Sequence, residues 1–427
     1  MVRQAVFFLL FGMALSAQTP PTGSLDPAFR NIPFESWFSG EQAHIRWAAE
    51  TAEPALSPHL RLRSAVKLKI DGRDLATRRG KGQMGMLIQI RDNHGGIWQT
   101  HEGILLSSLQ ESVVANDIEY TQPFFALPGD YEISLAIVDT ATREHATIRR
   151  KLHVPAAKNE PPDAWRDLPA IQFIHSNQPP DAWFIPDVKD TLRLMARPQH
   201  PSTIDILVNL TPTERLSGSN RSQDRNLSLL VPAMKVLAGA DWGDTPVRVS
   251  FLDLSNRKVT FDQEQVKTVD WEKAKASLAE MAPGIIDVKS LENRRFSANF
   301  FVQQVGKRID RTGSDPQRIV IVLSSPTAFE AGVERHQIEA EASGDAHVFY
   351  VRYHPYVSQV SIAPPPRPDL GRRDRFGDVV FHPAPPGAQD DQLAPLLKPI
   401  RPEVFDVLNP EQFRKTVATI LDEVSRL

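Results

Sequence analysis

The stretch TIDILVNLTPT, residues 203–213, decides how the second half of this 427-residue chain folds. Residues 204–210 form an almost continuous apolar run of strand length, which is typical of a strand buried on both faces of a parallel sheet. Downstream of it, apolar runs of strand length alternate with helical periodicity, and this alternation predicts an α/β domain whose sheet is covered on both faces. The predicted strands are 204–210, 247–254, 318–323, 346–353 and 403–407, and the predicted helices are 222–237, one begun by Asp270, one around 300–309 and one begun by Asn409.

The first half of the chain has a different pattern. From residue 42 to residue 155, short apolar runs are separated by turn signals at a spacing that favours an antiparallel β-sandwich. Tyr131, Ile133 and Leu135 alternate with polar residues after the turn at Pro128–Gly129, so they share one face of a strand. The predicted strands are 44–47, 62–70, 84–90, 103–107, 118–125, 131–139 and 145–154. This turn and the tyrosine after it resemble the corner before a late strand in immunoglobulin-like and fibronectin-type sandwiches.

Composition and charge narrow the possible functions. A formal net charge of −3 gives no electrostatic reason to bind nucleic acid, so we expect no nucleic-acid partner. The chain has no cysteine, and this excludes disulfides, thiolate metal sites and thiol catalysis.

Residues 1–17 have the pattern of a secretory signal peptide. Arg3 precedes an apolar run from Ala5 to Leu15, and small residues around Ala17 provide a cleavage site. The run is shorter than the roughly 20 residues that a permanent membrane helix needs. We therefore expect a secreted or periplasmic protein with no integral membrane segment after cleavage.

The predicted organisation is multidomain, an all-β sandwich followed by a doubly wound α/β domain. Its parts are a signal peptide at 1–17, a linker at 18–41, an immunoglobulin-like sandwich at 42–155, a linker at 156–170 and an α/β domain at 171–427 with a proline-rich insertion at 361–402. Long loops of this kind are functional or disordered in most domains. We therefore predict that replacing residues 363–400 by a short Gly/Ser linker leaves cooperative unfolding nearly unchanged.

The order of elements in the second half resembles a von Willebrand factor type A domain, which has a Rossmann-type fold. The resemblance rests on residues 204–213, 246–251, 318–325 and 347–351, and on the closing strand and helix. The chain also resembles exported bacterial proteins that carry such domains.

In that family the first strand ends in D-x-S-x-S, which helps to bind a divalent cation. At the matching positions this chain has Asn209, Thr211 and Thr213, and a later family aspartate is matched by Ser324–Ser325. The loss of two carboxylates weakens the attraction for Mg²⁺, a hard cation that prefers charged oxygen ligands. We therefore predict a vestigial, non-functional metal site and no cofactor, with Mg²⁺ binding as the alternative. A remaining loop hydroxyl is either Ser290 or Ser297.

The remaining motifs do not indicate a catalytic or ligand-binding site. The G-x-G-x-x-G match at residues 80–85 precedes a strand instead of a helix, so a flexible basic hairpin explains it better than a dinucleotide site. The sequence contains no H-E-x-x-H, G-x-S-x-G or P-loop pattern. Asp390–Asp391 lies in a proline-rich stretch and reads as a solvated loop.

These observations predict an exported, non-enzymatic binding or adhesion-type protein that uses its α/β domain for protein–protein interaction. The alternative is an envelope-associated enzyme, a hydrolase, whose site is not visible as a sequence motif. The partner protein is not identified by the sequence.

Overall fold

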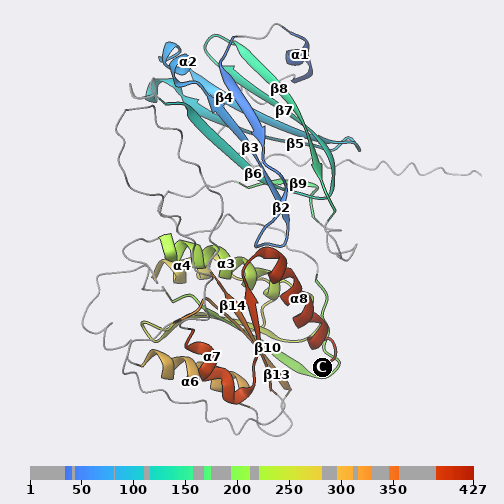
Figure 1. Ribbon diagram of the computed structural model, residues 1–427, viewed down its shortest axis with the longest axis vertical. Helices are drawn as coiled ribbons and strands as arrows, with labels where there is room; N and C mark the ends of the chain where they lie inside the picture. The colour runs from blue at the N-terminus through green and yellow to red at the C-terminus, as the bar shows by residue number, and fades with distance from the viewer. Residues whose placement is uncertain are drawn as a thin grey trace, which may run out of the picture. The chain divides into compact units, whose positions relative to one another are not determined.

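The computed structural model describes residues 34–40, 44–80, 82–109, 116–156, 168–174, 194–211, 221–280, 296–310, 316–327, 346–354 and 391–427. Contacts divide the chain into two compact units. The described residues of unit 1 lie within 1–52, 66–121 and 129–154, and those of unit 2 lie within 53–65, 122–128 and 155–427. The strands form three sheets, which we call sheets A, B and C (Figure 1).

Sheets A and B are built from the strands of the first half of the chain. Sheet A has the order β1-β3-β6-β9, and β2 also pairs with β3. Sheet B has the order β5-β4-β7-β8, and its neighbours are all antiparallel. The strands are β1 (Trp47–Thr51), β2 (Ala55–Leu56), β3 (Leu62–Ile70), β4 (Gln83–Asp92), β5 (Ile97–Leu105), β6 (Ile118–Ala126), β7 (Gly129–Asp139), β8 (His145–Val154) and β9 (Ile171–Phe173).

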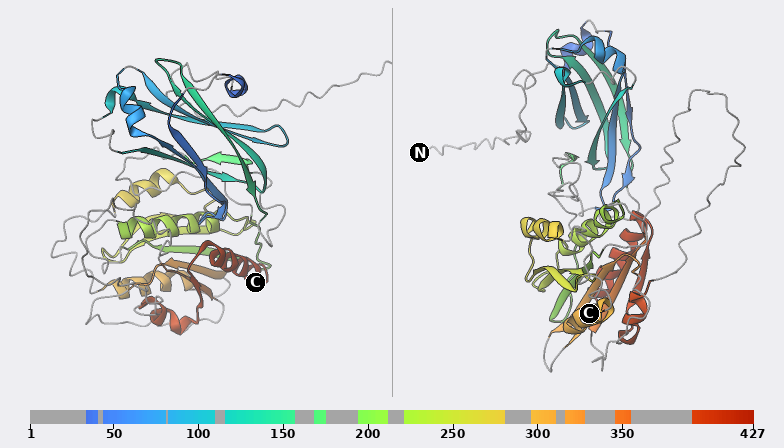
Figure 2. Two further views of the ribbon diagram at one scale, coloured as in Figure 1. Left: turned by 45° about the horizontal axis from the view of Figure 1, so that its top comes forward. Right: turned by 90° about the vertical axis from the view of Figure 1, so that its left-hand side faces the viewer.

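Within unit 1 the two sheets face each other (Figure 2, right). The alternation of side chains along each strand sends one set of apolar residues inward. On β4 and β7 the inward set is fully buried: Met84, Met86, Ile88, Ile90, Ile133, Leu135 and Ile137. Two short helices accompany this unit, α1 (Phe34–Ser39) and α2 (Gly72–Thr77), and a 3₁₀ turn follows β5 at Leu106–Ser108. Asp71 caps α2 by accepting hydrogen bonds from the backbone of Arg73 and Asp74.

Sheet C lies in unit 2 and has six strands in the order β12-β11-β10-β13-β14-β15. They are β10 (Ser202–Asn209), β11 (Val247–Asp253), β12 (Lys258–Gln263), β13 (Gln317–Ser324), β14 (Ala346–Tyr353) and β15 (Glu403–Val407). All neighbours run parallel except β12, which pairs antiparallel with β11 at one edge. From β10 the chain continues to one edge of the sheet, and from β13 it continues to the other.

Helices cover both faces of sheet C (Figure 1). One layer contains α3 (Arg221–Ala238), α4 (Trp271–Glu280) and α8 (Pro410–Val424), and the other contains α6 (Ser297–Ile309), α7 (Leu393–Leu397) and the 3₁₀ turn η5 (Lys398–Ile400). The apolar residues along one face of α8 are all buried: Phe413, Val417, Ile420, Leu421 and Val424. Asn409 caps this helix by accepting a hydrogen bond from the Gln412 backbone.

The structure corrects several expectations. Part of the predicted 18–41 linker is helix α1, whose Phe34 is buried against sheet B. Strand β9, expected in the α/β domain, pairs with β6 of sheet A. Residues 83–85 of this match belong to β4, and the element before that strand is helix α2, so the match is not a hairpin between two strands.

The predicted insertion 361–402 also ends too late. Residues 393–400 form α7 and η5, and four of their side chains lie in the core beneath sheet C: Leu393, Leu396, Leu397 and Ile400. Replacing residues 363–400 would remove these buried side chains, so we now expect that replacement to destabilise the fold. The predicted signal peptide and most of the predicted linker 156–170 lie outside the described residues.

Candidate functional site

The candidate site lies where the chain direction changes in sheet C. Strands β10 and β13 are neighbours, and the connections after them leave toward opposite edges. In open parallel sheets, ligands bind outside the carboxyl ends of the two strands at such a switch point. Asn209 ends β10 and is paired with Ser324, which ends β13.

Asn209 is buried and its side-chain amide is fully hydrogen-bonded. Its Nδ2 donates to Ser324 Oγ at 2.8 Å and to Thr327 Oγ1 at 3.0 Å. Its Oδ1 accepts from the Thr211 hydroxyl at 2.6 Å and from the Thr211 backbone N–H at 3.2 Å. Both protons and both lone pairs of the amide are therefore used within the protein.

The hydroxyl groups around Asn209 are also committed. Ser324 and Thr327 donate their hydroxyl protons to the Ser325 carbonyl, at 2.7 and 3.0 Å. Thr211 Oγ1 accepts from the Leu254 backbone N–H at 2.7 Å, which ties the end of β10 to the residue after β11. We call the residues Asn209, Thr211, Ser324, Ser325, Thr327 and Asp391 the switch-point network.

Asp391 reaches the network from a distant part of the sequence. Its side chain is only 2% exposed. Oδ1 accepts from the backbone N–H groups of Thr327 and Leu393, at 3.3 and 3.2 Å. Oδ2 accepts from the Tyr350 hydroxyl at 3.0 Å and from Arg352 Nη1 at 3.2 Å. The interpretation of Asp391 as part of a solvated loop is therefore wrong.

Burial and charge pairing shift the pKa values of Tyr350 and Asp406 in this corner. Burial, and the adjacent Asp391 carboxylate, raise the pKa of Tyr350 well above its usual value, so the phenol stays a donor. Arg352 also forms two hydrogen bonds with Asp406, at 2.7 and 2.9 Å, and these hold the pKa of Asp406 below its usual value. His354 Nε2 lies 2.7 Å from the same Asp406 carboxylate.

The donor set does not fit a hard cation. The oxygen atoms that a magnesium ion would need already accept hydrogen bonds, and the amide of Asn209 directs its protons into the network. The described ranges contain no group of three or more His, Cys, Asp or Glu side chains arranged to hold a metal ion. Of the sequence candidates, Asn209 and Thr211 come together, whereas Thr213 and Ser290 lie outside the described residues.

Ser297 lies next to the network. Its hydroxyl donates to the Leu254 carbonyl at 2.6 Å, and the Leu254 N–H in turn donates to Thr211. Phe296, the preceding residue, is 46% exposed, and the Arg257 guanidinium lies 5.2 Å from the centroid of its ring. An exposed aromatic residue and an arginine thus flank the network at the carboxyl edge of sheet C.

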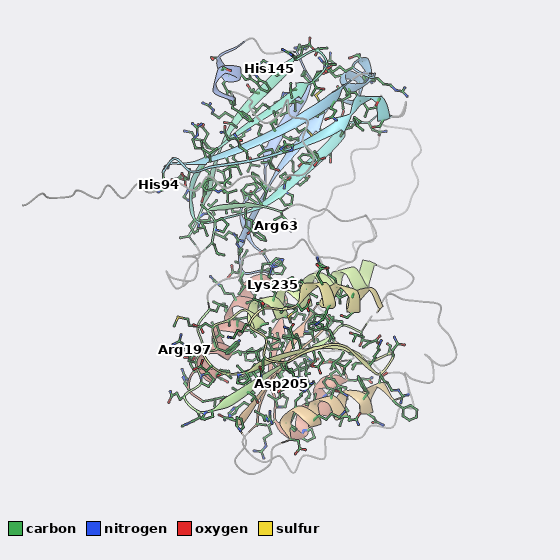
Figure 3. The ribbon with its side chains drawn as sticks, turned by 180° about the vertical axis from the view of Figure 1, so that it is seen from behind. Arg63, His94, His145, Arg197, Asp205 and Lys235 are labelled. Carbon is green, nitrogen blue, oxygen red and sulfur yellow. The ribbon has the colours of Figure 1, made fainter. Side chains whose placement is uncertain are left out.

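A second buried charged cluster lies on the same face of sheet C. Asp205, labelled in Figure 3, is on β10 and is paired with Arg308 of α6 at 3.5 Å. Burial raises the pKa of Asp205, and the arginine opposes that shift. Because its side chain is buried beneath α6 and precedes Asn209 on the strand by four residues, this carboxylate is not presented at the carboxyl edge.

Comparisons with known proteins add little to this picture. No family model matches the chain, and no curated protein matches it. Among solved structures, one described as "X-ray structure of Northeast Structural Genomics Consortium target SoR45" aligns at 11% identity over 28% of this chain and 93% of that chain, with a TM-score of 0.17. A likeness at that TM-score carries no argument about fold or function. Across the described residues, no helix combines the length and apolarity needed to cross a membrane.

Proposed function

We propose that the protein is an exported, non-catalytic binding protein whose α/β unit engages a partner protein at the carboxyl edge of sheet C. In this proposal the unit is a von Willebrand A-like domain with a vestigial metal site, preceded by an immunoglobulin-like sandwich. The observation that carries it is the hydrogen bonding of Asn209, whose amide is saturated by Ser324, Thr327 and Thr211. A network of this kind stabilises the end of the sheet but offers no free base or nucleophile.

The residues beside the network support a binding role. Phe296 is exposed next to Arg257, and aromatic residues and arginine are enriched at the energetically dominant positions of protein interfaces. Ser297 and Leu254 connect this pair to Thr211 by hydrogen bonds, so the pair is presented on a rigid base.

The test is a capture experiment with matched variants. The full chain is immobilised and exposed to the envelope fraction of its source, next to a Phe296→Ala/Arg257→Ala variant and a control variant, Ile97→Ala, on exposed β5 of unit 1. We expect one protein to be retained by the wild type and the control, and lost with the carboxyl-edge variant. Equal retention by all three, or hydrolysis of an ester or peptide substrate that Asn209→Ala abolishes, would contradict the proposal.

A further inference from the structure

The outer face of sheet B, the face turned away from sheet A, is unusually apolar. Leu87 on β4 and Ala136 and Val138 on β7 alternate with the inward residues, so they point outward, yet they are only 5%, 0% and 6% exposed. The solvent face of an antiparallel sheet is ordinarily polar. Another element must therefore cover this face.

Helix α1 covers it. Phe34 is buried against Leu87, Ala136 and Val138, and Trp37 and Phe38 pack on the same cluster. Figure 1 shows α1 beside β7 and β8.

Two side chains of β8 contact the aromatic rings of α1. The Trp37 ring stacks on His145, with ring centroids 4.4 Å apart and an angle of 20° between the planes. The guanidinium carbon of Arg149 lies 4.2 Å from the centroid of Phe38. His145, labelled in Figure 3, pairs with Val138, and Arg149 pairs with Ser134, so both belong to the outer face.

Helix α1 depends on this face for its structure. It has six residues, and isolated helices shorter than about 12–15 residues are marginal in water. The contact between Trp37 and His145 also has a cost, which is the burial of a polar atom of His145. His145 Nε2 is buried with no hydrogen-bond partner among the described residues, and release of Trp37 would return it to water. The described contacts between this helix and sheet B are therefore a small set of aromatic and apolar ones.

We propose that the outer face of sheet B is a docking site for the aromatic α1 segment, and that it accepts α1 from a second copy of this chain in exchange for its own. The α1 segment is the ligand whose fit to this face the structure shows, and every copy carries it. Exchange replaces each contact of α1 with sheet B by an identical contact from the other copy. Reciprocal exchange fills both faces and closes as a two-fold dimer.

The first experiment tests the docking site. A fluorescent peptide of residues 31–42 is titrated with the full chain and with a segment variant, Trp37→Ala/Phe38→Ala, in which the resident helix is weakened. We expect the peptide to bind the segment variant at least tenfold more tightly than the wild type, whose own α1 competes. The same peptide carrying Trp37→Ala and Phe38→Ala is the matched control and should not bind. Failure of the unmodified peptide to bind the segment variant overturns the docking site.

The second experiment tests the occupant by complementation. A face variant, Leu87→Gln/Val138→Gln, retains the α1 segment but loses its docking site. The segment variant retains the site but loses the anchors. Each should sediment as a monomer alone, and their mixture should form a heterodimer. Thermal unfolding by circular dichroism checks that both fold, and His145→Ala serves as a second face variant with a smaller change.

The outcomes separate the two parts of the proposal. A heterodimer that forms only in the mixture supports exchange between copies. Peptide binding without a heterodimer overturns the second copy as the occupant and leaves α1 of the same chain as the segment that covers this face.

Discussion

Asn209 is better suited to its position than an aspartate would be. The hydroxyls of Ser324 and Thr327 direct their protons to the Ser325 carbonyl, so they face Asn209 as acceptors. The Asn209 amide nitrogen donates a proton to each of these two hydroxyl oxygens. An aspartate carboxylate has no proton to donate, so its oxygen would repel both hydroxyl oxygens. Compared with an aspartate, the amide avoids a buried negative charge and also completes the hydrogen-bond network.

We therefore predict that Asn209→Asp lowers the free energy of unfolding. The change leaves two buried acceptors without their donor, an effect of about 1–3 kcal/mol. Urea denaturation at neutral pH measures it. Asn409→Asp is the matched control, because aspartate caps a helix as well as asparagine does and should leave the stability nearly unchanged. Equal stability of the two variants would contradict the role of the amide.

The same residue predicts weak metal binding. We expect calorimetric titration of the wild type to show no Mg²⁺ affinity tighter than roughly millimolar, the weak end of oxygen-ligand sites. Asn209→Asp combined with Ser325→Asp should raise the affinity if the two positions match the family's carboxylates. Micromolar binding to the wild type that Thr211→Ala abolishes would refute the vestigial site.

Glu403 on β15 predicts a pH dependence. Burial and the neighbouring Glu423 carboxylate raise the pKa of Glu403 to about 7, from an ordinary value of 4.5. A raised pKa means that this group stabilises the fold fully below pH 4.5, and that the contribution is lost as the pH rises through about 7. Because Glu403 is solvent-exposed, the effect is small. Glu403→Gln should match the wild type in acid and exceed its unfolding free energy at pH above 7.

At the scale of elements, the sequence predicts best those strands that are buried on at least one face. Strand β3 has the predicted bounds, 62–70, because buried positions alternate with more exposed ones along its whole length. Strand β12 was not predicted, because as an edge strand it buries only Phe261 and carries no periodic signal. Strand β5 begins six residues before the predicted start, since it too is an edge strand with mostly exposed side chains.

The candidate site was predictable only in part, for a similar reason. Asn209 and Ser324 end two apolar runs that pair in parallel in the sheet, so their proximity follows from that pairing. Asp391 and Tyr350 meet through tertiary packing, and nothing in their local sequence indicates it. From sequence alone, an aspartate in a proline-rich stretch is expected to be exposed to solvent. Only the structure shows the groups that donate hydrogen bonds to Asp391.

Helix α7 gives a prediction at this scale. Replacing residues 363–390 by a Gly/Ser linker should preserve the cooperative unfolding transition, because the replacement ends before Asp391 and the buried leucines. Extending the replacement to residue 400 should abolish or strongly lower the transition, since it removes Leu393, Leu396 and Leu397. As a point test, Leu397→Ala should lower the unfolding free energy by about 2–5 kcal/mol, with exposed Lys398→Ala as the neutral control.

At the scale of the whole molecule, the division into two units does not follow a single point in the sequence. Strands β3 and β6 contribute residues to both units, so the boundary crosses the chain more than once. A sequence pattern locates linkers between consecutive segments, so it does not predict a boundary that crosses the chain more than once.

Export is a prediction about the whole molecule. The signal pattern at residues 1–17 predicts that the mature chain begins near Ala17 or Gln18 and is found outside the cytoplasm. Cleavage there leaves Phe34 and Trp37 in place, so the mature protein keeps the helix that covers sheet B. N-terminal sequencing of protein from the native source, after fractionation, measures both the start and the compartment. Arg3→Glu, which removes the positive charge ahead of the apolar run, should retain precursor in the cytoplasm, whereas Arg30→Glu, beyond the cleavage site, should not. Native protein that keeps Met1 in the cytosolic fraction would refute export.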